Sequence, residues 1–193
     1  HTATVHDRQF LSPRPPRHGL SHESLARLGR LDVRLAGSDA DRDAAFRLRH
    51  EVFVAEHGAR PPHANLLGGT ESEPLDETAH HVLVWDGADL VGTARAHLPQ
   101  TGLLSGGAAD LFDVAALFAR HPSLRFGEVG RACVAASHRG GHVLDALLSG
   151  LWAWGCDHAI DVLFGLASLP GAAPASHADA LARIAALCPP GPL

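Results

Sequence analysis

Hydrophobic and polar positions follow two different periods along the chain, and together they predict strands and helices in succession. Residues 31–35 alternate apolar and polar side chains, which is typical of a half-buried strand. Residues 38–56 instead carry apolar side chains at helical spacing, at Ala45, Leu48 and Val52. Ser38 begins this segment in a capping-box pattern and Gly58 follows its end, so both boundaries of the helix are predicted as well.

The rest of the chain predicts a mixed α/β fold. The further elements expected are a hairpin at 81–85 and 90–97, a helix at 110–118, a strand at 126–134, a helix at 142–156, a strand at 161–166 and a weak helix at 176–187. A strand–helix–strand unit favours parallel neighbours, so we expect the last two strands to pair in parallel. The hairpin interrupts the alternation of strand and helix. This excludes a doubly wound Rossmann sheet and predicts a mixed central sheet flanked by helices.

Two segments stand outside this pattern. Residues 1–30 are rich in Pro, Arg and His, and we expect a flexible N-terminal arm there, with a short helix at 21–28. Residues 31–193 are then expected to form one domain. Residues 59–78 form a long connection that concentrates acidic side chains, and a connection of this length is usually functional or disordered.

Composition excludes several classes of function. All 16 basic residues are Arg, so a Schiff-base lysine, a pyridoxal-phosphate lysine and a Walker A loop are impossible. The net charge of -5 argues against a nucleic-acid partner. Three widely spaced cysteines indicate a reducing compartment. The 15 histidines form no metal-ligand motif, so we expect no metal site. No apolar run is long enough to span a membrane.

The strand at 126–134 is the most informative segment, because it carries two charges inside an apolar run. Ionised groups are costly in such a setting unless they are paired or used. Glu128 is therefore a candidate general base, and the alternative of an ion pair with Arg131 or Arg95 stays open. Regular alternation puts Glu128 and Arg131 on opposite faces of the sheet, unless a bulge intervenes, which Gly130 would permit.

Five segments of the chain carry motifs that resemble one group of acyltransferases. They are residues 48–59 (L-R-x-x-V-F-x-x-E-x-G-A), 73–84 (an acidic loop leading into D-H-L-L-V), 91–95 (V-G-T-x-R), 128–134 (E-x-G-R-x-C-V) and 160–171 (I-D-x-x-F-G-x-A-S-x-P-G). The group is the GNAT-type N-acyltransferases that use acyl carrier protein. It includes the bacterial ornithine-lipid (hemolysin-like) N-acyltransferases, the N-acyl amino acid synthases and the acyl-homoserine-lactone synthases. The resemblance implies a GNAT-like fold whose C-terminal part lies beyond the given sequence.

The resemblance also implies roles for individual residues. Glu128 and Arg131 would form the catalytic centre. The residues expected to bind the acceptor substrate are Arg49, Phe53, Glu73, Asp76 and Arg95. The alternatives stay open: a surface helix charge for Arg49, a solvated acidic loop for Glu73 and Asp76, and inert core for Phe53 and for Cys133, a conceivable nucleophile.

The acyl donor would be held where the helix at 142–156 begins. The residues expected to bind it are Val134, Arg139, Gly140 and Gly141. This loop departs from the R/Q-x-x-G-x-G/A pattern with which GNAT proteins hold the pyrophosphate of coenzyme A, which disfavours acetyl-CoA as the donor. Arg120, Arg125 and Arg139 are the residues expected to dock the acidic carrier protein.

By resemblance, the expected activity is transfer of a β-hydroxyacyl chain from acyl carrier protein to the α-amine of ornithine or a similar amino acid. The product would be a lyso-ornithine-type lipid. No bound cofactor is expected, because the phosphopantetheine thioester of the carrier is itself the donor. We expect a cytoplasmic protein with peripheral contact at the inner membrane. Two alternatives stay open: an acyl-homoserine-lactone synthase that uses S-adenosylmethionine, and a non-catalytic GNAT-like module that binds acyl carrier protein or lipid.

Overall fold

A mixed six-stranded sheet forms the centre of the computed structural model, which describes residues 24–61, 64–99, 107–168 and 173–187. The strands are β1 (Ser24–Leu28), β2 (Leu31–Leu35), β3 (His80–Asp86), β4 (Asp89–His97), β5 (Phe126–Val134) and β6 (Val162–Gly165), and they pair in this order. All neighbours are antiparallel except β5 and β6, which are parallel. The expected mixed sheet and the parallel pairing of its last two strands are confirmed.

Four α-helices accompany the sheet within the described residues. They are α1 (Asp39–Arg49), α2 (Val114–Arg120), α3 (Val143–Asp157) and α4 (Ala178–Leu187). A π-helix, η1 (His50–Glu56), continues α1, and short 3-10 helices occupy η2 (Leu67–Gly69), η3 (Pro74–Glu77), η4 (Gly107–Asp110), η5 (Ala136–His138) and η6 (Pro174–His177). Ser38 caps α1 by accepting from the Asp41 N–H, as the capping-box pattern predicts. Among these described elements, no helix is long and apolar enough to cross a membrane.

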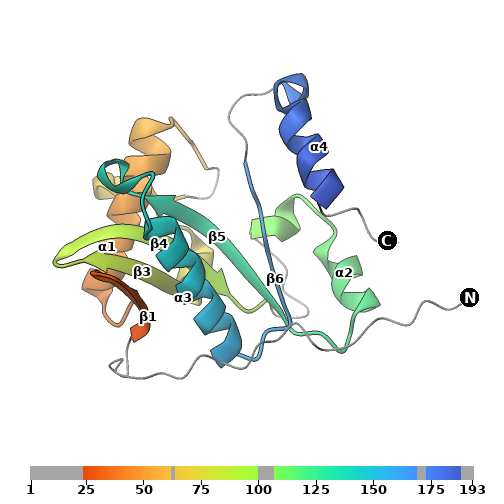
Figure 1. Ribbon diagram of the computed structural model, residues 1–193, viewed down its shortest axis with the longest axis horizontal. Helices are drawn as coiled ribbons and strands as arrows, with labels where there is room; N and C mark the ends of the chain where they lie inside the picture. The colour runs from red at the N-terminus through yellow and green to blue at the C-terminus, as the bar shows by residue number, and fades with distance from the viewer. Residues whose placement is uncertain (1–23, 62–63, 100–106, 169–172, 188–193) are drawn as a thin grey trace, which may run out of the picture.

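The two faces of the sheet are covered by different elements. Figure 1 shows α3 in front of the sheet and α1 behind it. Alternate strand residues pack with α3 in the main core, which comprises Leu31, Val33, Val82, Val84, Val91, Ala94, Ala96, Val143, Ala146, Leu147, Leu151 and Trp154. The other face is far less apolar. Against α1 and η1 it buries a small cluster of Leu48, Val52 and Cys133. The same face also carries buried polar and charged side chains, which are described below.

The sheet opens between its last two strands. Pairing of β5 with β6 covers Phe126 to Val129, whereas β5 itself continues to Val134. Figure 1 shows β6 running away from β5 toward α4. The second half of β5 therefore has β4 beside it on one side and no β6 partner on the other.

Two local expectations were wrong. Residues 24–28 form β1, an edge strand of the sheet, and not part of a helix at 21–28. Residues of the expected arm thus join the domain, because β1 pairs with β2 through a turn at Gly29, which has a φ of 60°. The remaining arm residues, 1–23, lie outside the described part of the chain. The helix expected at 110–118 begins only at Val114, because Asp113 caps it by accepting from the Ala116 N–H.

Candidate active site

A β-bulge in β5 organises the site. Thr93 pairs with Cys133 and Arg95 with Gly130, so β5 has one residue more than β4 between these two pairs. The residue that takes the left-handed conformation is Arg131, with a φ of 50°. The expected bulge is present, but the permissive Gly130 does not supply its unusual backbone geometry. A left-handed non-glycine residue costs about 1–2 kcal/mol, so the surrounding contacts must hold Arg131 in place.

The bulge brings the two charges of β5 to one face of the sheet. Arg95 and His97 lie opposite Gly130 and Glu128 on the neighbouring strand, so Arg95, His97 and Glu128 share a face. Arg131 contacts Glu73, and Glu73 also contacts Arg95, so the Arg131 guanidinium reaches that same face. Regular alternation would have placed it on the side of α3.

Glu128 is buried without a guanidinium partner. Its residue is 6% exposed, and one carboxylate oxygen, Oε1, accepts the Ala108 N–H at 2.7 Å. Burial raises the pKa of Glu128, an effect that the Ala108 N–H and the charge of Arg95 oppose and Asp110 reinforces. Within the described residues no salt bridge joins Glu128 to Arg95 or Arg131. The ion-pair alternative is therefore not the state of this carboxyl.

The acceptor-site residues expected from the sequence form one connected network of charges. Arg49, which is 1% exposed, donates two hydrogen bonds of 2.9 Å to the two oxygens of Asp76 and a third to Glu71. Arg95 bridges Glu73, at 2.7 Å, and Asp76, at 3.3 Å. Burial would lower the pKa of Arg49, but its bonds to Asp76 and Glu71 outweigh this and raise it. Arg49 is thus a buried charge and not a surface one.

Only one end of this network meets solvent. The side chains of Arg131 and Glu73 are 24% and 13% exposed and contact each other directly. Arg131 also lies 3.5 Å from Glu71, through Nη2 and Oε1, and 5.9 Å from the ring centre of Phe53. Glu71, an acidic residue of the connection at 59–78 that no motif singled out, is fully buried. The Arg131–Glu73 pair is the part of the network that an incoming molecule could reach without unfolding the loop.

The residues expected to hold the acyl donor meet at the start of α3. Arg139 donates to the backbone oxygen of Val134 at 3.2 Å, and its Nη2 donates to Glu56 Oε2 at 2.7 Å. Gly140 has a φ of 76°, a conformation that favours glycine, and Gly141 leads to His142, the N-cap residue of α3. The loop therefore ties the end of β5 to η1 and leaves backbone N–H groups at the helix N-terminus.

Cys133 does not behave as a nucleophile. It is packed in the cluster with Leu48 and Val52, and burial raises the pKa of its thiol to about 12. A thiol with that pKa is almost entirely protonated at neutral pH. The inert-core interpretation of Cys133 is therefore the one that the structure supports.

An apolar pocket of about 580 Å³ opens on the same face as Glu128. It is lined by Leu98, Pro99, Ala115, Phe118, Ala119, His121, Pro122, Leu124, Arg125, Phe126 and Ile160. Phe126 lies two residues before Glu128 on β5, and Phe164, which contacts both Phe118 and Phe126, is the β6 partner of Glu128. The pocket thus lies at the start of the strand that carries Glu128, and Glu128 itself is not one of its lining residues. Its volume is typical of a small-molecule site.

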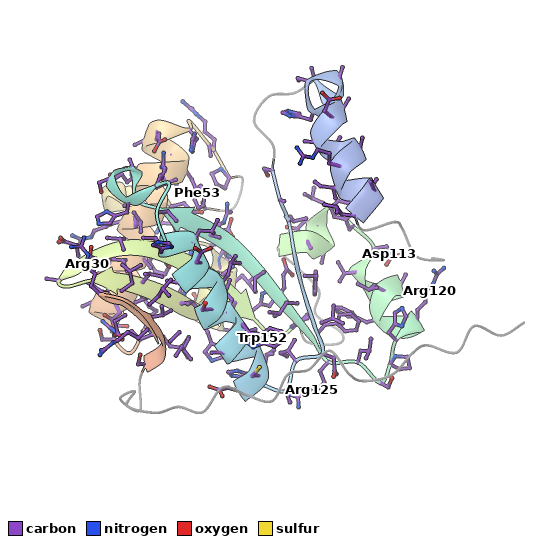
Figure 2. All side chains as sticks on the ribbon, in the orientation of Figure 1. Arg30, Phe53, Asp113, Arg120, Arg125 and Trp152 are labelled. Carbon is purple, nitrogen blue, oxygen red and sulfur yellow. The ribbon has the colours of Figure 1, made fainter. Side chains whose placement is uncertain are left out.

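Two features of the site differ from the sequence interpretation. His97 points at Glu128, with 3.6 Å between Nε2 and Oε2, although no motif singled it out. Its position directly opposite Glu128 could have been found only from the strand register. The three arginines expected to dock the carrier do not gather. Arg139 pairs with Glu56 of η1, the helix that also carries Phe53. Figure 2 shows Arg120 at α2 and Arg125 below α3, each away from Phe53.

Comparison with known proteins is consistent with this geometry. Residues 48–149 match the family described as Acetyltransferase (GNAT) domain. An L-ornithine N(alpha)-acyltransferase of Agrobacterium fabrum is 36% identical over 180 residues, which are 89% of this chain and 61% of the relative. The enzyme of the same name from Brucella abortus is 39% identical over 163 residues, 80% of this chain and 58% of the relative. The chain thus spans about three fifths of the length of these curated relatives.

Solved structures agree on the fold. The N-acyl amino acid synthase FeeM from uncultured soil microbes superposes with a TM-score of 0.53 at 16% identity, covering 69% of each chain. The AHL synthase LasI superposes with a TM-score of 0.51 at 16% identity, covering 69% of this chain and 70% of its own. At these identities the likeness concerns the arrangement of strands and helices alone.

Proposed function

Because the chain belongs to the acetyltransferase (GNAT) domain family, we propose that it transfers an acyl chain to the α-amine of L-ornithine. Ornithine is the acceptor named in its relatives, four of which are 33–39% identical. The observation that carries the proposal is the buried Glu128, whose Oε1 is held by the Ala108 N–H and which shares its face of the sheet with Arg131, turned there by the bulge in β5.

Glu128 is the general base of the proposed reaction. The α-amine of an amino acid is mostly protonated at neutral pH and cannot attack a thioester in that form. Glu128 accepts the proton, the neutral nitrogen attacks the thioester carbonyl, and a C–N bond forms. The C–S bond then breaks, and the second proton that the nitrogen loses passes to the sulfur, which leaves as a thiol. The raised pKa of Glu128 makes it a better proton acceptor than an exposed carboxylate. Backbone N–H groups on the unpaired part of β5 are suited to stabilise the oxyanion.

The Arg131–Glu73 pair suits an acceptor that carries both an anion and a cation. In the proposed complex the α-carboxylate of ornithine binds Arg131 and its side-chain ammonium binds Glu73, so the substrate replaces the contact between the two. Arg49, Asp76 and Arg95 hold these two groups from behind and do not touch the substrate. Of the expected acceptor residues, Glu73 thus contacts the substrate together with Arg131, whereas Arg49, Asp76 and Arg95 form a buried support.

The apolar pocket suits the acyl chain. Phe118, Phe126 and Leu98 offer apolar surface near the start of β5, the strand that carries Glu128, and burying each CH₂ group of a chain stabilises binding by about 0.8 kcal/mol. The donor is a thioester of acyl carrier protein, whose phosphopantetheine arm lies along residues 139–141 and the N-terminus of α3. The lyso-lipid product and a peripheral contact with the membrane from the cytoplasmic side are parts of the same proposal.

The test is an assay with a panel of acceptors. The purified protein is incubated with β-hydroxyacyl carrier protein and each amino acid, and the products are identified by mass spectrometry. We expect acylated ornithine as the main product. The Glu128→Gln variant should lower kcat roughly 10²- to 10⁴-fold, whereas Glu77→Gln, an exposed acid of the same loop region as Glu73, should not.

Two outcomes would contradict the proposal. A lactone formed from S-adenosylmethionine would make the protein an acyl-homoserine-lactone synthase. Binding of the acylated carrier without any product, with Glu128→Gln indistinguishable from the unchanged protein, would make it a binding module.

A further inference from the structure

His97 and Glu128 face each other across two neighbouring strands. They are direct partners in the register of β4 and β5, and the His97 Nε2 atom lies 3.6 Å from Glu128 Oε2. The other carboxylate oxygen is held by the Ala108 N–H of η4. The two oxygens of Glu128 therefore have different surroundings: Oε1 is fixed by the backbone, and Oε2 faces an imidazole.

The contact is not an ion pair at neutral pH. Burial lowers the pKa of His97 to about 4, and the positive charge of Arg95 adds to this. A neutral imidazole carries one N–H and one acceptor nitrogen, so His97 can direct an N–H at Glu128 Oε2. A distance of 3.6 Å is longer than a hydrogen bond, and such contacts at catalytic groups often shorten when the substrate binds.

Packing alone does not account for an imidazole at this position. The His97 side chain is 12% exposed, and burying a polar ring is unfavourable unless the ring gains a partner. Among the described residues, the polar contact of this ring is with Glu128. The other charged groups that influence Glu128 are Arg95 on β4 and Asp110 of η4. Arg95 lowers the pKa of Glu128 and Asp110 raises it. His97 differs from both, because it is a neutral side chain that faces the carboxylate directly.

We infer that His97 is a positioning residue for Glu128: its N–H aims the Oε2 oxygen at the acceptor amine and favours the ionised carboxylate. This inference rests on the proposed function only where it names the acceptor amine. The contact between His97 and Glu128 is given by the strand register and does not depend on the proposed function. It follows that loss of the His97 N–H makes Glu128 harder to ionise, so that the carboxyl stays protonated to a higher pH.

The test compares two variants. His97→Phe keeps the ring but has no N–H, and we expect the Glu128 pKa, followed by NMR of the side-chain carboxyl carbon, to rise by about one unit. His97→Gln restores a side-chain N–H, and we expect it to return the Glu128 pKa toward that of the unchanged protein. His57→Ala, an exposed histidine of another element, is the matched control and should leave the pKa of Glu128 unchanged.

Acyl transfer gives the second readout. A base must be ionised, so the rate falls as pH drops through the Glu128 pKa, and His97→Phe should move this acidic limb to higher pH by the same amount. A Glu128 pKa that is the same in His97→Phe and in the unchanged protein would overturn the inference. A shifted pKa in a protein that transfers no acyl group would overturn the proposed function and leave the His97–Glu128 pair standing.

Discussion

Arg131 combines a strained backbone conformation with a proposed role in binding the acceptor. Its left-handed backbone, with a φ of 50°, is unusual for a residue with a long side chain. Glu73 and Glu71 hold the guanidinium on the face of the sheet where Glu128 lies. A strained residue that persists at a bulge is often part of a functional site, and here the strained backbone places a cation on the same face of the sheet as the proposed base.

Arg131→Lys tests whether the guanidinium binds the acceptor. Lysine keeps the charge but cannot form two parallel hydrogen bonds to a carboxylate. Loss of one charge-assisted hydrogen bond, about 1.5 kcal/mol, should raise the KM for ornithine roughly tenfold. Steady-state kinetics at constant donor concentration would measure this, with the exposed Arg27→Lys as control. An unchanged KM for ornithine together with a lower kcat would assign Arg131 to the chemical step instead.

At the scale of elements, α1 and the connection at residues 59–78 are joined by buried charges. Arg49 near the end of α1 binds Glu71 and Asp76 of that connection, and the Glu71 N–H donates to the Phe46 backbone oxygen. The part of the connection from Glu71 to Asp76 is therefore held against the helix. This fixed position allows Glu73 to reach Arg95 and Arg131.

Removal of Arg49 should show how much this anchor contributes. Arg49→Ala leaves Glu71 and Asp76 buried without their cation, and we expect the free energy of unfolding in urea to fall by about 3–5 kcal/mol. Arg47→Ala, an exposed arginine two residues earlier in α1, should change it by no more than about 0.5 kcal/mol. Equal changes in the two variants would mean that the buried pairing of Arg49 contributes nothing beyond the loss of an arginine side chain from α1.

The helix α2 supplies one wall of the apolar pocket. Ala115 and Ala119 line it, one turn apart, beside Phe118. If the pocket holds the acyl chain, Ala119→Trp should shorten the longest chain that is transferred, because the indole fills part of the space. The assay is competition between short and long acyl donors. Ala116→Trp, on the same helix but away from the pocket lining, should leave the chain-length preference unchanged.

At the scale of the whole molecule, the sheet separates an apolar layer from a charged one. The α3 side buries aliphatic residues and Trp154, whereas the opposite side carries Arg49, Arg95 and Glu128. The helix α3 approaches the sheet closely at Gly150. A Cβ atom there would lie 2.4 Å from a methyl carbon of Val33. The apolar layer is therefore packed without spare volume at this point, and it supports the strands that carry the site.

Two glycines of α3 give a matched pair of variants. Gly150→Ala should lower the free energy of unfolding by about 1–3 kcal/mol, because the new methyl group has no room. Gly155→Ala meets its nearest neighbour, Leu163, at 3.5 Å, so the gain in helix propensity should leave stability equal or higher by up to about 1 kcal/mol. Urea unfolding of both variants measures the difference. Similar stability of the two variants would mean that α3 moves away from the sheet without cost.

The order of the elements followed from local pattern. The alternation at residues 31–35, the helical stripe that begins at Ser38 and the apolar run of α3 each report a period that needs no distant partner. The segment at 24–28 is different. Its pattern is weak, and it became a strand because β2 offered an edge with which to pair.

The charges of the site could be recognised without coordinates, because ionised residues inside the apolar run of β5 require a partner or a use. The directions in which those charges point depend on the packed fold. One additional residue in β5 reverses the face of Arg131, and residue-by-residue alternation cannot reveal a bulge. Likewise, the pairings of Arg49 with Asp76 and of His97 with Glu128 join residues 27 and 31 positions apart, where only the register of the sheet and the path of the loop bring them together.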